Sequence, residues 1–253
     1  MEPGSPLNVP ALFKNPNKWT SSHLVGLQIE QHEHVDIAAI VGRTHLPMDG
    51  DPSFETLAED FAGPRITDFK SWHNSPFSTI FYYLSDLYHS RPNIFCQNSA
   101  TAQMYLFDMA SSFLTKAHFH ENSLFTDVDL PVAIFAGTKD PRGQICSAEE
   151  IVPYLLFQAI LEHERRSLEV SHNTFVVSMR GATLQFNKGV ISRTYAEDLL
   201  HRKVPSEPLR LLRSNTYNLL EQDGRRECSK AWLGLVRNLS AESEGATGIC
   251  VSD

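Results

Sequence analysis

A short apolar run near the middle of the chain constrains the fold more than any other feature of the sequence. Val132-Ala133-Ile134-Phe135-Ala136 ends at Gly137 and is followed by a polar loop from Lys139 to Gly143. A continuous apolar run of this length, bounded by turn residues, is typical of a strand that is buried on both faces. We therefore predict a buried strand from Pro131 to Lys139 as the central element of the domain.

Two helices are predicted before this strand. Ser75 and Pro76 suit the first positions of a helix that keeps helical apolar spacing as far as Tyr88. Its aromatic residues are expected to form core, with one ring exposed. A second helix is predicted from Ser99 to Lys116. The residues expected on its buried side are Leu106, Phe107, Met109, Ala110, Phe113 and Leu114.

A third helix and a β-hairpin are predicted after the strand. Ser147 is the expected N-cap of the helix, because Glu149 and Glu150 follow in a first turn where the helix dipole favours acids. The hairpin covers Asn173–Phe186 and turns at Gly181, which tolerates the backbone of a tight turn. Three further helices are predicted over Ser192–Arg202, Glu207–Leu220 and Cys228–Leu239.

This order of elements predicts an α+β fold, in which a small mixed β-sheet is flanked by helices. One domain is expected over residues 19–240, after a flexible N-terminus at 1–18 and before a disordered tail at 241–253. A chain of 253 residues with 42% hydrophobic content can bury such a core without disulfides. Its four cysteines form no CxxC pair, so neither a zinc site nor a disulfide framework is expected.

Charge and hydropathy limit the partners. The formal net charge of −8 gives no support to a nucleic-acid coat protein, although an enzyme with a local basic groove stays compatible with it. No stretch approaches the ~18 apolar residues that cross a membrane, and the polar N-terminus does not resemble a signal peptide. We expect an intracellular protein of the nucleus or cytoplasm, with no membrane partner.

Two charged residues flank the predicted strand. Asp127 precedes it, and Lys139 stands at its end. A metal-dependent nuclease needs a carboxylate that holds Mg²⁺ and a lysine beside it that orients the attacking water. Because the two residues could meet at one edge of a sheet, they are candidate site residues, although an Asp before a strand and a Lys after one are common.

In this order of elements the sequence resembles the PD-(D/E)XK nuclease superfamily, and more specifically a group of basidiomycete proteins with that fold. The resemblance extends from about Trp19 to Leu200. It includes Thr126-Asp127-Val128, Gln158 in the following helix, and the hairpin with its Gly181 turn. It implies a restriction-endonuclease-like core with added N- and C-terminal helices. It also implies Asp127, Lys139 and Gln158 as site residues, and Mg²⁺ as the cofactor of an active member.

The sequence departs from the motif of this family at one position. The family ends its strand with an acid, a variable residue and a lysine, whereas this chain has Gly137-Thr138-Lys139. Asp129 and Asp140 are the nearby substitutes, and we take Asp127 and Asp129 as the candidate metal ligands. The prediction is a catalytically inactive relative that acts as a binding or regulatory module for a protein or nucleic-acid partner. The alternative is a Mg²⁺-dependent nuclease that cuts DNA or RNA.

A group of histidines suggests a second alternative. His32, His34 and Asp36 would share one face of a strand as an HxHxD pattern, and imidazole is a common zinc or iron ligand. With His23 and His45 nearby, a His-ligated metal enzyme is one reading and ordinary surface histidines are the other. Gly-x-Ser-x-Gly, GxGxxG and P-loop motifs are absent from the sequence.

Overall fold

The fold was analysed on a computed structural model of the whole chain, which describes residues 19–89, 99–118, 132–137, 145–165 and 171–247. The helices in chain order are α2 (Ser21–Gly26), α3 (Ile37–Val41), the 3-10 helix η2 (Arg43–His45), α4 (Pro52–Ala62), α5 (Phe69–Trp72), α6 (Ser78–Tyr88), α7 (Ser99–His118), α8 (Ala148–Arg165), α9 (Arg193–Leu200) and α10 (Gln222–Thr247). The strands are β1 (Ile29–Val35), β2 (Val132–Gly137), β3 (Ser171–Arg180), β4 (Thr183–Ser192), β5 (Leu209–Ser214) and β6 (Tyr217–Asn218).

The strands form one mixed sheet in the order β1-β5-β4-β3-β2, with the short β6 paired to β4. The two outer pairs, β1 with β5 and β2 with β3, are parallel, whereas the central pairs are antiparallel. The predicted α+β class with a mixed sheet flanked by helices is therefore confirmed. The hairpin is also confirmed, and its turn is made by Gly181 at a φ of 58°, which a residue without a Cβ adopts at little cost.

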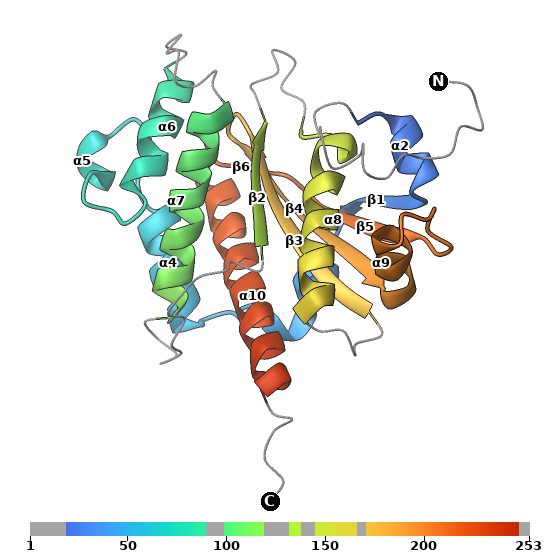
Figure 1. Cartoon of the computed structure of the whole chain (residues 1–253). Helices are drawn as coiled ribbons and strands as arrows, with labels where there is room; N and C mark the ends of the chain where they lie inside the picture. The colour runs from blue at the N-terminus through green and yellow to red at the C-terminus, as the bar shows by residue number, and fades with distance from the viewer. Residues whose placement is uncertain (1–18, 90–98, 119–131, 138–144, 166–170, 248–253) are drawn as a thin grey trace, which may run out of the picture.

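Helices cover both faces of the sheet (Figure 1). Two apolar cores lie between the helices and the sheet. One core lies under α4, α6, α7 and α10 and contains Phe61, Phe113, Phe186 and Trp232. The other lies under α2, α8 and α9 and contains Leu155 and other buried aliphatic residues. The central strands β3 and β4 contribute to both cores, because successive side chains of a strand point to opposite faces.

The predicted buried strand is described only in part, because Pro131, Thr138 and Lys139 lie outside the described residues. β2 covers Val132–Gly137, and within the described part of the chain it pairs with β3 alone, as an edge strand. Ala136 is buried, but Ala133, Ile134 and Phe135 are half-buried. Both faces of the apolar run are covered by helices, α7 on one side and α8 on the other, although the strand lies at an edge of the described sheet.

The segment Glu207–Leu220, predicted to be helical, instead forms β5 and β6. Leu209 and Leu211 are buried and Arg210 between them is exposed, which is the alternation of a strand. The pattern was obscured because Arg213 occupies an inward position.

Two helix boundaries and the exposure of three aromatic residues differ from the prediction. α6 begins at Ser78 rather than Ser75, whose hydroxyl accepts a hydrogen bond from the N–H of Phe77. Tyr82 and Tyr88 are both exposed on it, where one exposed ring was expected. Phe107 on α7 is 53% exposed rather than buried. α10 runs to Thr247, so it includes the first seven positions of the segment predicted to be a disordered tail.

Candidate functional site

The residues predicted from the nuclease motif divide into two groups. Asp127, Asp129 and Lys139 lie outside the described residues. Gly137 is the last residue of β2, and Gln158 lies half-buried on α8. Of the predicted motif, the structure therefore describes Gly137 at the end of the strand and Gln158 on the following helix, and no other site residue.

The end of β2 lies beside a cation. Gly137 is the register partner of Arg180, the last residue of β3. The Arg180 side chain is only 11% exposed and forms an ion pair with Oε1 of Glu150 on α8. It also donates from Nη1 to the carbonyl oxygen of Ile145 at 3.4 Å. A guanidinium thus lies near the position where the motif would end in an acid.

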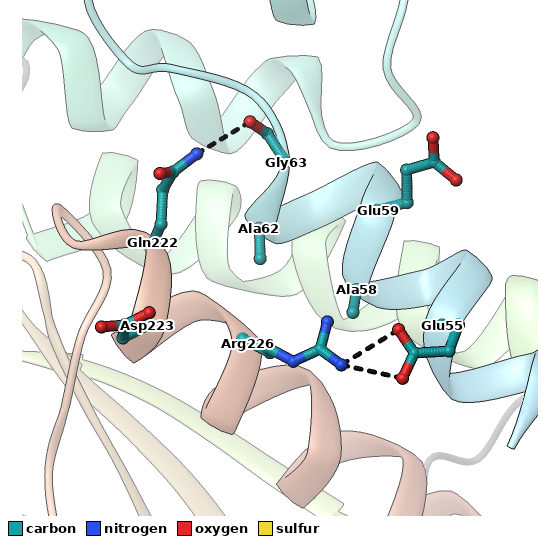
Figure 2. Close-up of a pocket in the computed structure, with 8 residues that line it drawn as sticks. All are labelled: Glu55, Ala58, Glu59, Ala62, Gly63, Gln222, Asp223 and Arg226. Carbon is teal, nitrogen blue, oxygen red and sulfur yellow. Dashed lines mark hydrogen bonds and ion pairs between the residues drawn. The ribbon is translucent and has the colours of Figure 1, made fainter. Parts of the chain in front are cut away.

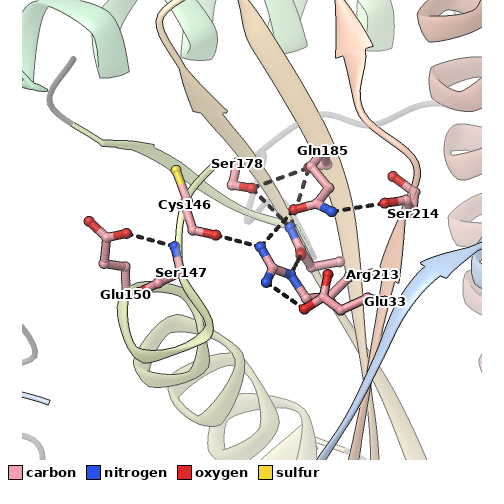
Figure 3. A network of polar contacts seen from close by, with 9 residues as sticks. Glu33, Cys146, Ser147, Glu150, Ser178, Gln185, Arg213 and Ser214 are labelled. Atoms are coloured by element: carbon pink, nitrogen blue, oxygen red, sulfur yellow. Dashed lines mark hydrogen bonds and ion pairs between the residues drawn. The ribbon is translucent and has the colours of Figure 1, made fainter. Parts of the chain in front are cut away.

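The carboxylate that holds Arg180 has a structural contact on each of its oxygens. Oε1 of Glu150 binds the guanidinium. Oε2 accepts a hydrogen bond from the backbone N–H of Ser147 at 2.7 Å (Figure 3). The second bond caps α8 as the sequence predicted, although through Glu150 rather than the Ser147 hydroxyl. Each oxygen of this carboxylate thus has a structural partner.

A buried arginine lies near the same end of α8 (Figure 3). Arg213 on β5 has a side chain that is 5% exposed. Its guanidinium donates to Oδ1 of Asn187 at 3.2 Å, to Oε1 of Glu33 at 2.7 Å and to Oε1 of Gln185 at 2.8 Å. It also donates to the carbonyl oxygen of Cys146. This one residue links β1, β4, β5 and the segment before α8.

The amides around Arg213 extend the network across the sheet. Gln185 donates to the carbonyl oxygen of Ser214 at 2.8 Å, and Asn187 donates to the hydroxyl of Ser178 at 3.0 Å. Each amide thus both donates and accepts, so the network is satisfied internally and its chemistry is structural rather than catalytic. Sequence reasoning missed it, although two amide residues at positions 185 and 187, which share one face of the predicted strand, were an available signal.

A groove opens between α4 and the start of α10 (Figure 2) and has a volume of about 420 Å³. Its lining comprises Glu55, Ala58, Glu59, Ala62, Gly63, Gln222, Asp223 and Arg226. Arg226 binds both carboxylate oxygens of Glu55, at 2.8 and 3.0 Å. The three carboxylates of the lining outnumber its one cation, so the groove does not suit phosphate groups. It contains no residue of the predicted motif.

The predicted HxHxD arrangement does not form. Asp36 is the N-cap of α3, where its side chain accepts from the N–H of Ala38 at 2.7 Å. His34 has a φ of 56°, and the register of β1 shifts between His32 and Val35. Among the described residues, no three His, Cys, Asp or Glu side chains gather as a metal site would require. The exposed His32 and His34 therefore match the surface reading.

The structure also bears on the cysteines and on membrane-spanning helices, within the residues that it describes. Cys146 and Cys228, the two cysteines in the described ranges, are buried and form no disulfide. Over the same ranges, no helix combines the length and the hydropathy that crossing a membrane demands. Comparison of the chain with protein-family models, with curated proteins and with solved structures found no match.

Proposed function

We propose that the chain has a PD-(D/E)XK-like core with a degenerate nuclease site, and that it acts as a binding or regulatory module. The observation that carries the proposal is the end of β2. Gly137 occupies the position where the resemblance implies an acid, and its register partner Arg180 brings a positive charge there. A second carboxylate is what a Mg²⁺ site most needs at this place.

The order of elements supports the same proposal. β2, α8, β3 and β4 follow one another as the strand, helix and hairpin that the resemblance implies, and β2 and β3 are parallel neighbours. Because one fold serves many functions, this order supports the family and not a reaction.

The described residues do not fit a Mg²⁺ ion at the end of β2. Mg²⁺ takes oxygen ligands in octahedral geometry. Glu150 is the carboxylate that binds Arg180. Its two oxygens accept from Arg180 and from the N–H of Ser147, so the charge of this carboxylate is already paired. A guanidinium at this place would also repel a divalent cation. We therefore derive no metal-dependent step.

Cleavage assays on the purified full chain test the proposal. Single- and double-stranded DNA and RNA are incubated with Mg²⁺ or Mn²⁺, and the wild type is compared with Asp127→Ala and Lys139→Ala. We expect no cleavage beyond the level of the two variants. The alternative, an active nuclease, predicts turnover that both substitutions abolish and that Asp49→Ala, a change at an exposed acid, leaves intact.

A further inference from the structure

The outer edge of β2 is held by a side chain in the way that a neighbouring strand would hold it. Gln103 on α7 donates from Nε2 to the carbonyl oxygen of Ile134 at 2.5 Å. The Oε1 of the same amide accepts from the backbone N–H of Ala136 at 3.3 Å. Since β3 is the one sheet partner of β2 within the described ranges, these two backbone groups point away from the sheet.

The Gln103 amide imitates a peptide group. In a parallel ladder, one residue of the neighbouring strand donates to a C=O and accepts from an N–H that flank the residue opposite it. The carbonyl of Ile134 and the N–H of Ala136 flank Phe135 in this way. Gln103 therefore occupies the hydrogen-bonding positions of one residue of an added strand, and an incoming peptide could replace it without leaving either edge group unpaired.

Apolar surface lies beside this edge on α7. Phe107 follows Gln103 by one helical turn on the same side of the helix and is 53% exposed. Met104, next to Gln103, is 57% exposed. These are among the large apolar side chains that the described protein leaves in solvent, and such surface marks interaction sites when it is contiguous.

The opposite flank of β2 is formed by α8. The ring of Tyr154 packs against Phe135 with 5.0 Å between the ring centroids. Gln158, which the resemblance implies as a site residue, lies one turn after Tyr154 on the same side of α8 and is half-buried. Met104, Phe107, Tyr154 and Gln158 are uncharged, and Glu150, one turn before Tyr154 on α8, is paired with Arg180.

We propose that the outer edge of β2 is a docking site for an extended segment of a partner protein, which adds to the sheet as a further strand. Its alternate side chains would pack against Met104 and Phe107 on one face and against Tyr154 and Gln158 on the other. These four uncharged side chains favour a neutral segment with alternating apolar residues. The inference rests on the proposed binding role and gives that role a partner chemistry.

Peptide binding by the full chain tests this proposal. The probe is a short fluorescein-labelled peptide of alternating valine and threonine, and binding is followed by fluorescence anisotropy. The control peptide has the same side chains but is N-methylated at every residue, so it cannot donate to Ile134. We expect the unmodified peptide alone to bind. Gln103→Ala removes the competing amide and should tighten binding about fivefold.

Two exposed positions give a matched pair of variants. Phe107→Glu places a charge beside the edge and should weaken binding by about tenfold or more. Val204→Glu changes a side chain of similar exposure, 51%, in the loop after α9 and should leave binding unchanged. Both positions are exposed, so we expect both variants to fold.

Three outcomes would overturn the proposal. One is no binding by wild type and Gln103→Ala at millimolar peptide, and another is binding that tolerates N-methylation or Phe107→Glu. The third is self-association of Gln103→Ala in sedimentation runs, which would assign the edge to a second copy of the chain. None of these depends on the cleavage result, so failure of the docking site and failure of the degenerate-nuclease proposal are separable.

Discussion

Arg225 on α10 should be among the most costly residues to remove, although no carboxylate pairs with it in the described structure. Its side chain is 1% exposed, and its guanidinium donates to five backbone carbonyl oxygens, those of Phe61, Ala62, Pro64, Leu219 and Leu220, at 2.6–3.3 Å. Burial lowers the pKa of Arg225 to about 10, so the group still carries its charge at neutral pH.

The magnitude follows from these contacts. Three of the carbonyls belong to the C-terminal end of α4 and the residues just after it, where a helix has unpaired carbonyls and favours a cation. A hydrogen bond to a charged group contributes roughly 1.5–3 kcal/mol, and much of that sum is offset by desolvation of the guanidinium. We expect Arg225→Ala to lower the free energy of unfolding by about 4 kcal/mol, or the Tm by about 12 °C.

The neighbouring residue provides the matched control. Arg226 is 44% exposed, binds Glu55 and lies 4.8 Å from the centroid of the Phe54 ring. An exposed ion pair of this kind contributes less than about 1 kcal/mol. Urea unfolding followed by tryptophan fluorescence compares Arg225→Ala with Arg226→Ala. Free energies of unfolding that agree within about 1 kcal/mol would refute the reasoning, because the buried carbonyl contacts would then have no special weight.

Two further predictions concern the caps and the close contacts of the fold. Asp51 caps α4, and its hydrogen bond to Arg237, at 2.8 Å, holds the pKa of its carboxyl below the usual 3.8. This stabilisation is complete above about pH 4 and is lost as the pH falls through the lowered pKa. Asp51→Asn, which keeps the cap, should therefore cost about 1–2 kcal/mol at pH 7 and little at pH 2 in urea titrations. A cost that is the same at both pH values would count against the role of the Arg237 contact. Gly224→Ala should destabilise by more than about 3 kcal/mol, because the added Cβ would lie 2.1 Å from a β6 carbonyl oxygen. Gly181→Ala, with a φ of 58° but open space around it, should cost only about 1 kcal/mol in thermal melts; equal costs would contradict the steric argument.

The parts of the fold that were predictable are those that local patterns determine. The third helix follows from its apolar spacing and its acidic first turn, and the hairpin follows from Gly181 between two β-rich segments. These signals act between residues that are close in the chain, so the sequence contains them in full.

The errors concern features that depend on distant residues. β5 is a strand because it pairs with β1 and β4, which lie far from it in the chain, and its local pattern is disturbed by Arg213. The edge position of β2 depends on which other strands pair with it. An apolar run has the same sequence pattern at the edge of a sheet as at its centre, so the pattern does not predict this position. Long-range pairing of this kind overrides local propensity.

The sequence identifies candidate site residues, but it does not predict which other side chains surround them in the fold. The sequence predicts that Gly137 replaces the motif acid. It does not predict that the neighbouring strand has an arginine directly beside Gly137. Arg180 comes to that place through the parallel register of β2 and β3, and Glu150 through the packing of α8. Likewise, nothing in the local sequence links Gln103 to the edge of β2, since the two lie about thirty residues apart.

Mn²⁺ binding, measured by calorimetry on the full chain, tests the central claim of a degenerate metal site most directly. The wild type is compared with Asp127→Ala, and Asp49→Ala provides the matched surface control. A motif that lacks its second carboxylate should give no saturable heat that Asp127→Ala removes. A one-site isotherm that disappears in Asp127→Ala and persists in Asp49→Ala would contradict the claim and favour an active nuclease.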